Sequence, residues 1–471
     1  MELYVSEFSK YIIALLIALY TYECFAVFRY DDEARRSGIY TRQNLLMFLF
    51  HFSSFLVICF ETEDITYLFF YAFQQIMLYA SIVLFRMIYP KGNRLIINNM
   101  CMLLSISFVI LTRLDFQKAI RQFAIVVVSM IIAMIVPFLI TKLKFLKNLQ
   151  WIYAMVGIAA LSAVLILGKT TYGSKISFSV AGVTFQPSEF VKILFVFFIA
   201  SALYKSSGFF EVFTSAVVAA AHVVVLVLSR DLGSALIFFV VYVLMVYVAT
   251  KNLLYVGAGI VGGSAAAYIA YRVFAHVQVR VQAWKDPWSV IDAAGYQITQ
   301  SLFAISSGGW FGLGLFKGTP ESIPFVEADF IFSAIAEELG IIFAICLILI
   351  CVSCFIMFMN ISVKLNDKFY QLIAFGMGVM YIFQIFLTIG GGSKFIPLTG
   401  VTLPLISYGG SSILSTLLMF SIVEGLYVVK QDESERIGKG RRIRKTRMRT
   451  REDFEIDEDE DNTESEEDEE T

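Results

Sequence analysis

Apolar runs of about 20 residues recur along this chain, and they constrain its fold more than any other feature. A run of that length crosses a hydrocarbon core as one helix, whereas barrel strands alternate in polarity and are about half as long. The composition agrees, because 58% of the residues are hydrophobic and only 16% are charged. The sequence predicts an all-α polytopic membrane protein with about 13 transmembrane helices. The expected spans are 10–28, 43–60, 66–88, 97–112, 122–140, 151–168, 188–205, 211–228, 232–250, 253–273, 331–359, 369–389 and 411–429.

Charges in the connecting loops indicate an orientation. Alternate loops are rich in Lys and Arg, and the last member of that set is the basic stretch after the final span. By the positive-inside rule the C-terminus is expected in the cytoplasm, and an odd number of spans then puts the N-terminus outside. Arg113, Lys118 and Arg121 are exceptions, because they fall on the expected outer side. The basic excess indicates contact with anionic membrane lipids rather than nucleic acid.

Three expected outer segments are long: 169–187, 274–330 and 390–410. The loop 274–330 is the longest, and its tryptophans and glycines are typical of a folded cap rather than a linker. Non-helical backbone at membrane depth must be buried in protein or line a wet cavity. We therefore expect an outward-facing cavity beneath this loop. The tail 431–471, basic and then acidic, is expected to be a disordered cytoplasmic segment.

Cofactor motifs are scarce. The six cysteines lie in apolar runs without CxxC spacing, and only three histidines occur, so neither residue type predicts a metal site. No phosphate-binding GxxxxGK[ST] motif is present, which argues against ATP as the energy source.

Burying a polar side chain at membrane depth costs free energy, so such residues usually have a bonding partner or a functional role. Glu189 and Lys192 are three residues apart on one helix face, so they can pair. The pair either fixes helix packing or forms the wall of a polar cavity. Arg230 and Asp231 lie between two spans, where the arginine either stabilises a turn or faces a phosphate.

Two carboxylates, Glu327 and Asp329, lie where the large loop re-enters an apolar helix. One interpretation makes Asp329 the N-cap of that helix. The other uses its apolar neighbours Phe330 and Phe332, since burial would raise its pKa and suit it to act as a general base. The Gly- and Pro-rich segment 390–412 predicts unwound backbone that brings Lys394 to the same face. An outer face with carboxylates, cations and an aromatic cap suits a substrate with a lipid tail, a phosphate and a polar head.

Five motifs in this order resemble the SEDS proteins of the RodA/FtsW/SpoVE type. The resemblance covers about 97–430 as a core of ten spans, and leaves 1–96 as an N-terminal extension of three spans. The extension either packs against the core or receives a partner's helix. The motifs are QPSEFVK at 186–192, RDLGSAL at 230–236, the stretch 284–314, PFVEADFIFSAIAEELG at 324–340 and IPLTGVTLPLISYGGSS at 396–412.

The resemblance implies a peptidoglycan glycosyltransferase of the bacterial cytoplasmic membrane, which polymerises lipid II on the outer face beside a class B penicillin-binding protein. It implies that Asp329 deprotonates the acceptor hydroxyl and that undecaprenyl pyrophosphate leaves with inversion. A divalent cation, Mg²⁺ or Mn²⁺, could assist. The residues 399–402 lean toward the division and sporulation branch rather than elongation. The substrate-binding candidates are Arg280, Lys394, Arg230, Glu189, Lys192, Glu327, Ser411 and Ser412.

Glu327 departs from the family pattern, which often has a polar pair such as His-Thr before the aspartate. A second carboxylate there either raises the pKa of Asp329 further or helps to hold a cation. The third interpretation is that the difference is neutral variation. Two other functions stay open: a lipid II flippase, and a non-catalytic scaffold of a cell-wall complex. A transporter would favour inverted repeats with interrupted spans, and a scaffold would give Asp329 no purpose.

Overall fold

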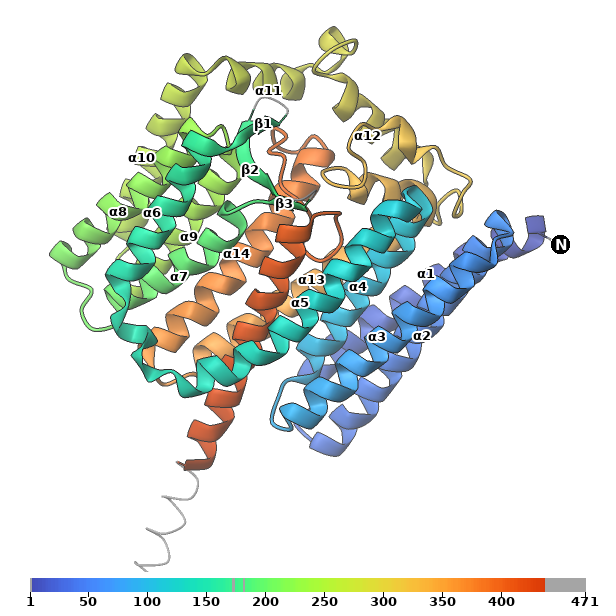
Figure 1. Ribbon diagram of the computed structural model, residues 1–471, viewed down its shortest axis with the longest axis horizontal. Coiled ribbons are helices and arrows are strands. Elements are labelled where there is room, and N and C mark those ends of the chain that lie inside the picture. The colour runs from blue at the N-terminus through green and yellow to red at the C-terminus, as the bar shows by residue number, and fades with distance from the viewer. Residues whose placement is uncertain (1, 172–173, 181–182, 437–471) are drawn as a thin grey trace, which may run out of the picture.

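The computed structural model describes residues 2–171, 174–180 and 183–436, and these form a helical bundle with a cap on one side (Figure 1). Twelve of the described helices are long and apolar enough to cross a membrane. A thirteenth predicted span corresponds to α7, which has only 16 residues, so the count of thirteen stays a prediction. These twelve helices and the shorter α7 are α1 (Glu2–Arg29), α2 (Glu33–Thr62), α3 (Ile65–Ile88), α4 (Arg94–Leu114), α5 (Phe116–Lys142), α6 (Gln150–Leu167), α7 (Ser188–Leu203), α8 (Phe209–Leu228), α9 (Leu232–Thr250), α10 (Leu253–Val273), α13 (Ile331–Lys364), α14 (Lys368–Gly392) and a last helix, Gly410–Arg436.

Helix α4 lies inside the bundle, and every residue from Leu95 to Thr112 is buried. The helices α1 to α3 pack beside it, with α2 and α3 against α4 and α1 against α13. Buried hydrogen bonds reinforce this contact: Asn99 accepts from Tyr20 of α1 at 3.0 Å and donates to Ser353 of α13 at 2.8 Å. Because interhelical polar bonds stabilise packing inside a membrane, the extension is held against the core by specific contacts as well as by shape.

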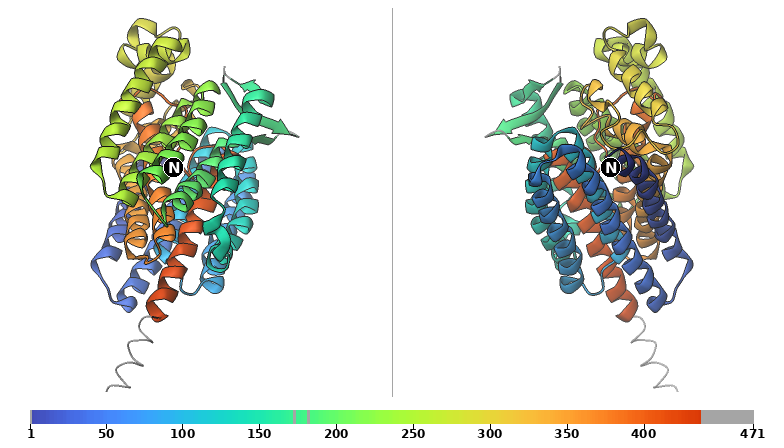
Figure 2. Two further views of the ribbon diagram at one scale, coloured as in Figure 1. Left: turned by 90° about the vertical axis from the view of Figure 1, so that its left-hand side faces the viewer. Right: turned by 90° about the vertical axis from the view of Figure 1, so that its right-hand side faces the viewer.

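The first helix begins on the side of the loop 274–330, and the last helix ends on the opposite side (Figure 2). That arrangement fits an odd number of crossings. Which side faces the cytoplasm stays the prediction made from the loop charges.

The outer segment 169–187 contains a small antiparallel sheet that the sequence did not predict. Its strands are β1 (Lys169–Thr171), β2 (Ser174–Val180) and β3 (Val183–Phe185), in the order β1-β2-β3. Phe178 pairs with Phe185 across β2 and β3. The sheet projects beyond the bundle on the side of the large loop (Figure 2).

The loop 274–330 is folded, as its composition predicts. It contains α11 (Ala275–Lys285), η2 (Trp288–Val290), α12 (Tyr296–Ser307) and η3 (Pro320–Ser322), and it crosses the top of the bundle (Figure 1). Helix η1 (Lys144–Asn148) connects α5 and α6 on the other side.

Helix α13 is broken near its start at Gly340, whose φ is 84°. The backbone of the large loop replaces the interrupted helical bonds, because Gly314 donates its N–H to Glu338 O at 2.9 Å and Ile341 donates to Gly309 O at 3.0 Å. A Cβ on Gly340 would lie 2.3 Å from the backbone of Gly312. Only glycine fits here, since the site needs both a left-handed φ and close backbone contact.

Candidate functional site

The large loop is attached to the Gly- and Pro-rich segment between α14 and the last helix. Arg280 of α11 donates from Nη1 to Thr399 O at 3.2 Å, and Trp284 donates from Nε1 to Lys394 O at 3.2 Å. These two bonds lie about one helical turn apart on α11. They bring two outer segments that are distant in sequence to the same place.

Asp329 lies in the turn that leads into α13. Its N–H donates to Phe325 O at 3.2 Å, and its carboxylate faces Gly400, where an added Cβ would lie 3.8 Å from Oδ2. The N-cap interpretation is wrong: α13 begins after Phe330, and no side chain of the described residues caps it. Because the carboxylate of Asp329 is not used as a cap, it is available for chemistry.

Burial raises the pKa of Asp329 to about 6, the Arg280 guanidinium lowers it, and the charge of Glu327 raises it. Asp329 as a whole residue is only partly buried. A carboxyl surrounded by protein, with a pKa close to the working pH, has the properties of a general base.

Glu327 is held by a lysine on the expected outer side. Lys118, in the first turn of α5, contacts Glu327 Oε1 at 2.5 Å and Asp115 Oδ2 at 3.4 Å. Lys118 was an exception to the positive-inside rule, and its ion pairs explain why it lies there. Glu327 is therefore an ion-paired carboxylate whose charge still raises the pKa of Asp329.

Arg113, a second exception to the positive-inside rule, also forms ion pairs. It pairs with Glu321 and, from Nη2 at 2.9 Å, with Glu338 Oε1, and it lies 4.5 Å from the centre of the Phe316 ring. Only 7% of the Arg113 side chain and 2% of the Glu338 side chain are exposed. This buried pair joins the end of α4 to the break in α13.

Positive charge gathers around Arg280. Burial lowers the pKa of Arg280, and the charges of Asp231 and Asp329 oppose that shift. The charges of Arg280 and Arg230 contribute to lowering the pKa of His276, after burial as the main cause. Arg280 thus lies near both aspartates, and Arg230 belongs to the same cluster.

A second polar cluster lies deeper in the bundle. Lys192 Nζ contacts Glu189 Oε2 at 2.7 Å and Gln384 Oε1 at 2.7 Å, as the spacing of Glu189 and Lys192 predicts. Ser415 donates to Glu189 Oε2 at 2.9 Å, and Gln384 donates to Thr402 O at 2.9 Å. These bonds satisfy the buried charges and link α7, α14 and the last helix.

Ser188 and Asp231 connect the two clusters. Ser188 Oγ donates to Asp231 Oδ2 at 3.1 Å, and burial raises the pKa of Asp231 despite this bond. Ser411 accepts from the Gln186 N–H at 2.9 Å, and Ser412 bonds with Thr402 at 2.7 Å. A continuous series of polar groups therefore runs from the outer loop toward the middle of the bundle.

The structure thus brings most of the predicted site residues into two adjoining clusters. Asp329, Arg280 and Arg230 belong to the outer cluster, and Glu189, Lys192, Ser411 and Ser412 belong to the inner one. Lys394 is different: among the described residues its ammonium has no hydrogen-bond or ion-pair partner, and only its carbonyl contacts α11. Sequence reasoning missed Lys118, Gln384 and Ser415. The last two could have been found as polar residues within apolar runs.

The described residues contain no group of three or more His, Cys, Asp or Glu side chains that could hold a metal ion. Glu327, the nearest carboxylate in sequence to Asp329, is instead paired with Lys118, and the charge of Arg280 acts on Asp329 itself. This arrangement does not fit a metal held by the protein alone.

The fold and the site define a multi-pass membrane protein with a folded cap over a charged polar site. The chain matches the FtsW, RodA and SpoVE family, described as "Cell cycle protein", over residues 86–432. The chain therefore belongs to this family. The match omits residues 1–85, which contain most of the N-terminal extension.

Relatives with RodA and FtsW names agree with the family match. The chain is 36% identical over 270 residues to a peptidoglycan glycosyltransferase RodA of Mycobacterium tuberculosis, an alignment that covers 53% of this chain and 57% of the relative. It is 31% identical over 344 residues to a probable peptidoglycan glycosyltransferase FtsW of Aliivibrio salmonicida, covering 70% of this chain and 85% of that protein. The chain thus spans little more than half the length of the mycobacterial relative.

Two solved structures share the fold. One, described under "Structural coordination of polymerization and crosslinking by a peptidoglycan synthase complex", has a TM-score of 0.62 and 23% identity, covering 72% of this chain and 98% of that one. The other, RodA of Thermus thermophilus, has a TM-score of 0.53 and 22% identity, covering 71% and 96%.

Proposed function

We propose that this protein is a peptidoglycan glycosyltransferase that polymerises lipid II on the outer face of the bacterial cytoplasmic membrane. The observation that carries the proposal is the environment of Asp329, a partly buried residue whose carboxyl has a pKa of about 6 and lies near the Arg280 charge. Relatives named RodA and FtsW carry this activity in their names. The membrane-spanning helices fit a lipid-linked substrate.

In the proposed reaction, Asp329 accepts the proton of the sugar 4-hydroxyl of an acceptor lipid II. The hydroxyl oxygen attacks the anomeric carbon of the growing chain from the side opposite the pyrophosphate. A new C–O glycosidic bond forms, the bond to pyrophosphate breaks, and undecaprenyl pyrophosphate leaves with the electron pair. Because a carboxylate with a raised pKa is a stronger base, burial of Asp329 favours the proton transfer.

Arg280 and Arg230 are the proposed pyrophosphate contacts, because both lie in the outer cluster with Asp329. A guanidinium offers paired donors that match phosphate oxygens. Lys394 is the third proposed contact, supported by its unpaired ammonium at the same outer segment. A divalent cation would have to be held mainly by the pyrophosphate itself, since the described residues offer no ligand cluster.

Glu189, Lys192, Ser411 and Ser412 are proposed to line the path of the lipid-linked headgroup. Their bonds form the inner polar cluster below the outer loop. A class B penicillin-binding protein is the proposed partner, and similarity of fold to a chain from a peptidoglycan synthase complex supports it. We further propose a cytoplasmic C-terminus and an external N-terminus.

A lipid II flippase is the second candidate, and the break in α13 favours it, since transporters contain interrupted helices. Transporters use such breaks to bind substrate, however, whereas backbone bonds from the large loop fill this one. The two functions can be separated with purified protein, its cognate penicillin-binding protein and labelled lipid II in liposomes. Glycan strands in detergent, where no sidedness exists, support the polymerase. Movement of labelled lipid II between leaflets without strands contradicts it.

A further inference from the structure

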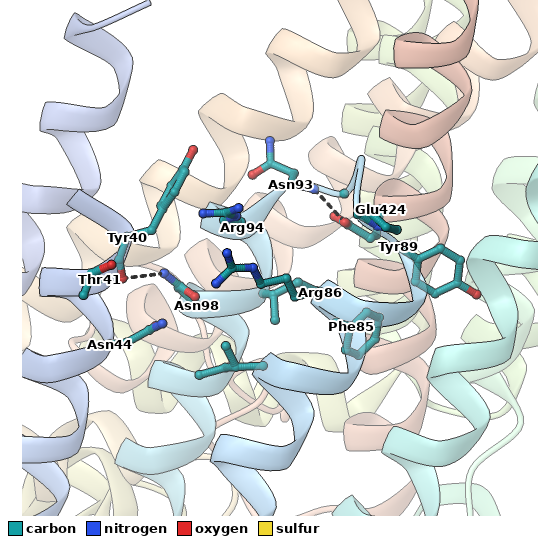
Figure 3. A pocket seen from close by; sticks show the side chains of 14 residues that line it. Tyr40, Thr41, Asn44, Phe85, Arg86, Tyr89, Asn93, Arg94, Asn98 and Glu424 are labelled. Carbon is teal, nitrogen blue, oxygen red and sulfur yellow. Dashed lines mark hydrogen bonds between the residues drawn. The ribbon is translucent and has the colours of Figure 1, made fainter. Parts of the chain in front are cut away.

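A separate polar pocket lies between the N-terminal extension and the core (Figure 3). Helices α2 and α3 form one wall, the start of α4 forms another, and Glu424 of the last helix closes it. The proposed reaction uses none of these residues. Their arrangement therefore calls for a separate explanation.

Two guanidinium groups line this pocket. Arg86 is in the last turn of α3, and Arg94 begins α4. Arg94 donates to Ser37 Oγ at 3.2 Å and lies 6.0 Å from the centre of the Tyr40 ring. Among the described residues, neither arginine has a carboxylate partner. The N-terminus of α4 adds further positive potential, so the pocket is suited to an anion.

The same pocket contains acceptors that lack donors. Glu424 is 1% exposed, and its Oε1 accepts the Asn93 N–H at 2.6 Å. Within the described part of the chain, its Oε2 has no hydrogen-bond partner, and neither has the buried Oδ1 of Asn44. Buried acceptors are normally satisfied because an unmade hydrogen bond costs about 1–3 kcal/mol. The pocket therefore also suits a ligand that carries hydroxyl donors.

The surroundings of the pocket are apolar on the outside of α3. Leu84, Met87 and Ile88 flank Arg86 in sequence and are 42%, 70% and 51% exposed. Acyl chains could lie along these side chains, which a free phosphate ion would leave uncovered. The surface next to the pocket thus indicates that the anion belongs to a lipid.

We propose that this pocket binds the headgroup of an anionic glycerophospholipid with free hydroxyl groups, of the phosphatidylglycerol type. Its phosphodiester contacts Arg86 and Arg94, and a glycerol hydroxyl donates to Glu424 Oε2. A zwitterionic headgroup fits less well, because its ammonium would lie near two guanidinium groups. The lipid would join the extension to the core, since both contribute to the pocket.

Native mass spectrometry of the purified full-length protein with defined lipids tests the proposal. We expect phosphatidylglycerol to bind at least about tenfold more tightly than phosphatidylcholine. The double variant Arg86→Gln/Arg94→Gln should lose this preference. Lys142→Gln should keep it, because Lys142 is an exposed cation in the last turn of α5, outside the pocket.

Glu424→Gln provides a second variant that preserves the fold. Glutamine can still accept the Asn93 N–H, but its amide nitrogen cannot accept a hydroxyl proton. The variant should therefore lose the preference for phosphatidylglycerol over phosphatidylmethanol, a phosphodiester lipid without headgroup hydroxyls. If the double arginine variant does not fold, this comparison still tests whether the pocket binds phosphatidylglycerol.

Several outcomes would overturn the proposal. They are equal binding of phosphatidylcholine, tighter binding of phosphatidylethanolamine, an unchanged preference in folded Arg86→Gln/Arg94→Gln, or an unchanged preference for phosphatidylglycerol over phosphatidylmethanol in Glu424→Gln. Competition by inorganic phosphate as strong as by the lipid would assign the pocket to a soluble anion. None of these measurements depends on glycan synthesis, so the lipid site and the proposed function can fail separately.

Discussion

The ion pair between Glu327 and Lys118 should tune the basicity of Asp329, and Glu327→Gln tests this effect. The charge of Glu327 raises the pKa of Asp329, which is about 6 in the native protein. Neighbouring like charges that are partly exposed to water interact by about 1 kcal/mol, which is somewhat less than one pKa unit. Glu327→Gln should therefore lower the pKa of Asp329 below about 6.

The assay is the pH dependence of lipid II polymerisation. Asp329 must be ionised to act as a base, so the wild-type kcat/KM should fall as the pH drops through about 6. In Glu327→Gln the midpoint should move lower by somewhat less than one unit. Activity at neutral pH should drop modestly, because the base is weaker.

Lys118→Met gives the opposite test, since it leaves the Glu327 carboxylate without its partner at 2.5 Å. The midpoint should then move upward by a few tenths of a unit or more. The double variant Glu327→Gln/Lys118→Met should lie between the two single variants. An unchanged or raised midpoint in Glu327→Gln would refute the reasoning, and loss of activity at every pH would make Glu327 the base.

Three further predictions concern stability, each checked by thermal unfolding of the purified protein. Arg113→Met leaves the buried Glu338 without its main partner and should cost about 3–5 kcal/mol; a melting temperature equal to wild type would contradict a structural role. Gly340→Ala should be far more destabilising than Gly309→Ala, because only the first Cβ meets backbone atoms although both φ angles are positive; equal effects would refute the steric account. Asn99→Leu removes the buried hydrogen bond from Tyr20 of the extension and the bond to Ser353 within the core and should cost about 1–3 kcal/mol, whereas no loss would mean that shape alone holds the extension.

The sequence predicts local features of this protein well. Apolar runs locate the long helices, although the runs underestimate α2, which begins at Glu33 rather than near residue 43. The pair Glu189 and Lys192 follows from its spacing, because residues three apart on a helix are neighbours. The small sheet was missed, since its three strands have three, seven and three residues and lie outside the apolar pattern.

Long-range pairing was not predictable from one sequence. Lys118 and Glu327 are separated by 209 positions, and no local pattern relates them. The positive-inside rule marked Lys118 as an exception, and such an exception is the signal that could have suggested an ionic role on the outer side. The sequence allowed Asp329 to be either a helix N-cap or a general base, because an aspartate before an apolar helix suits both roles. Only the described start of α13, after Phe330, separates them.

In the proposed reaction, Asp329 is the general base of lipid II polymerisation. The most direct measurement compares glycan strand synthesis by wild type, Asp329→Asn and Glu327→Gln, each with the cognate class B penicillin-binding protein and each checked for folding. The account predicts strands from wild type and Glu327→Gln, and a loss of at least about 100-fold in Asp329→Asn. Strands formed by a folded Asp329→Asn at the wild-type rate would contradict it.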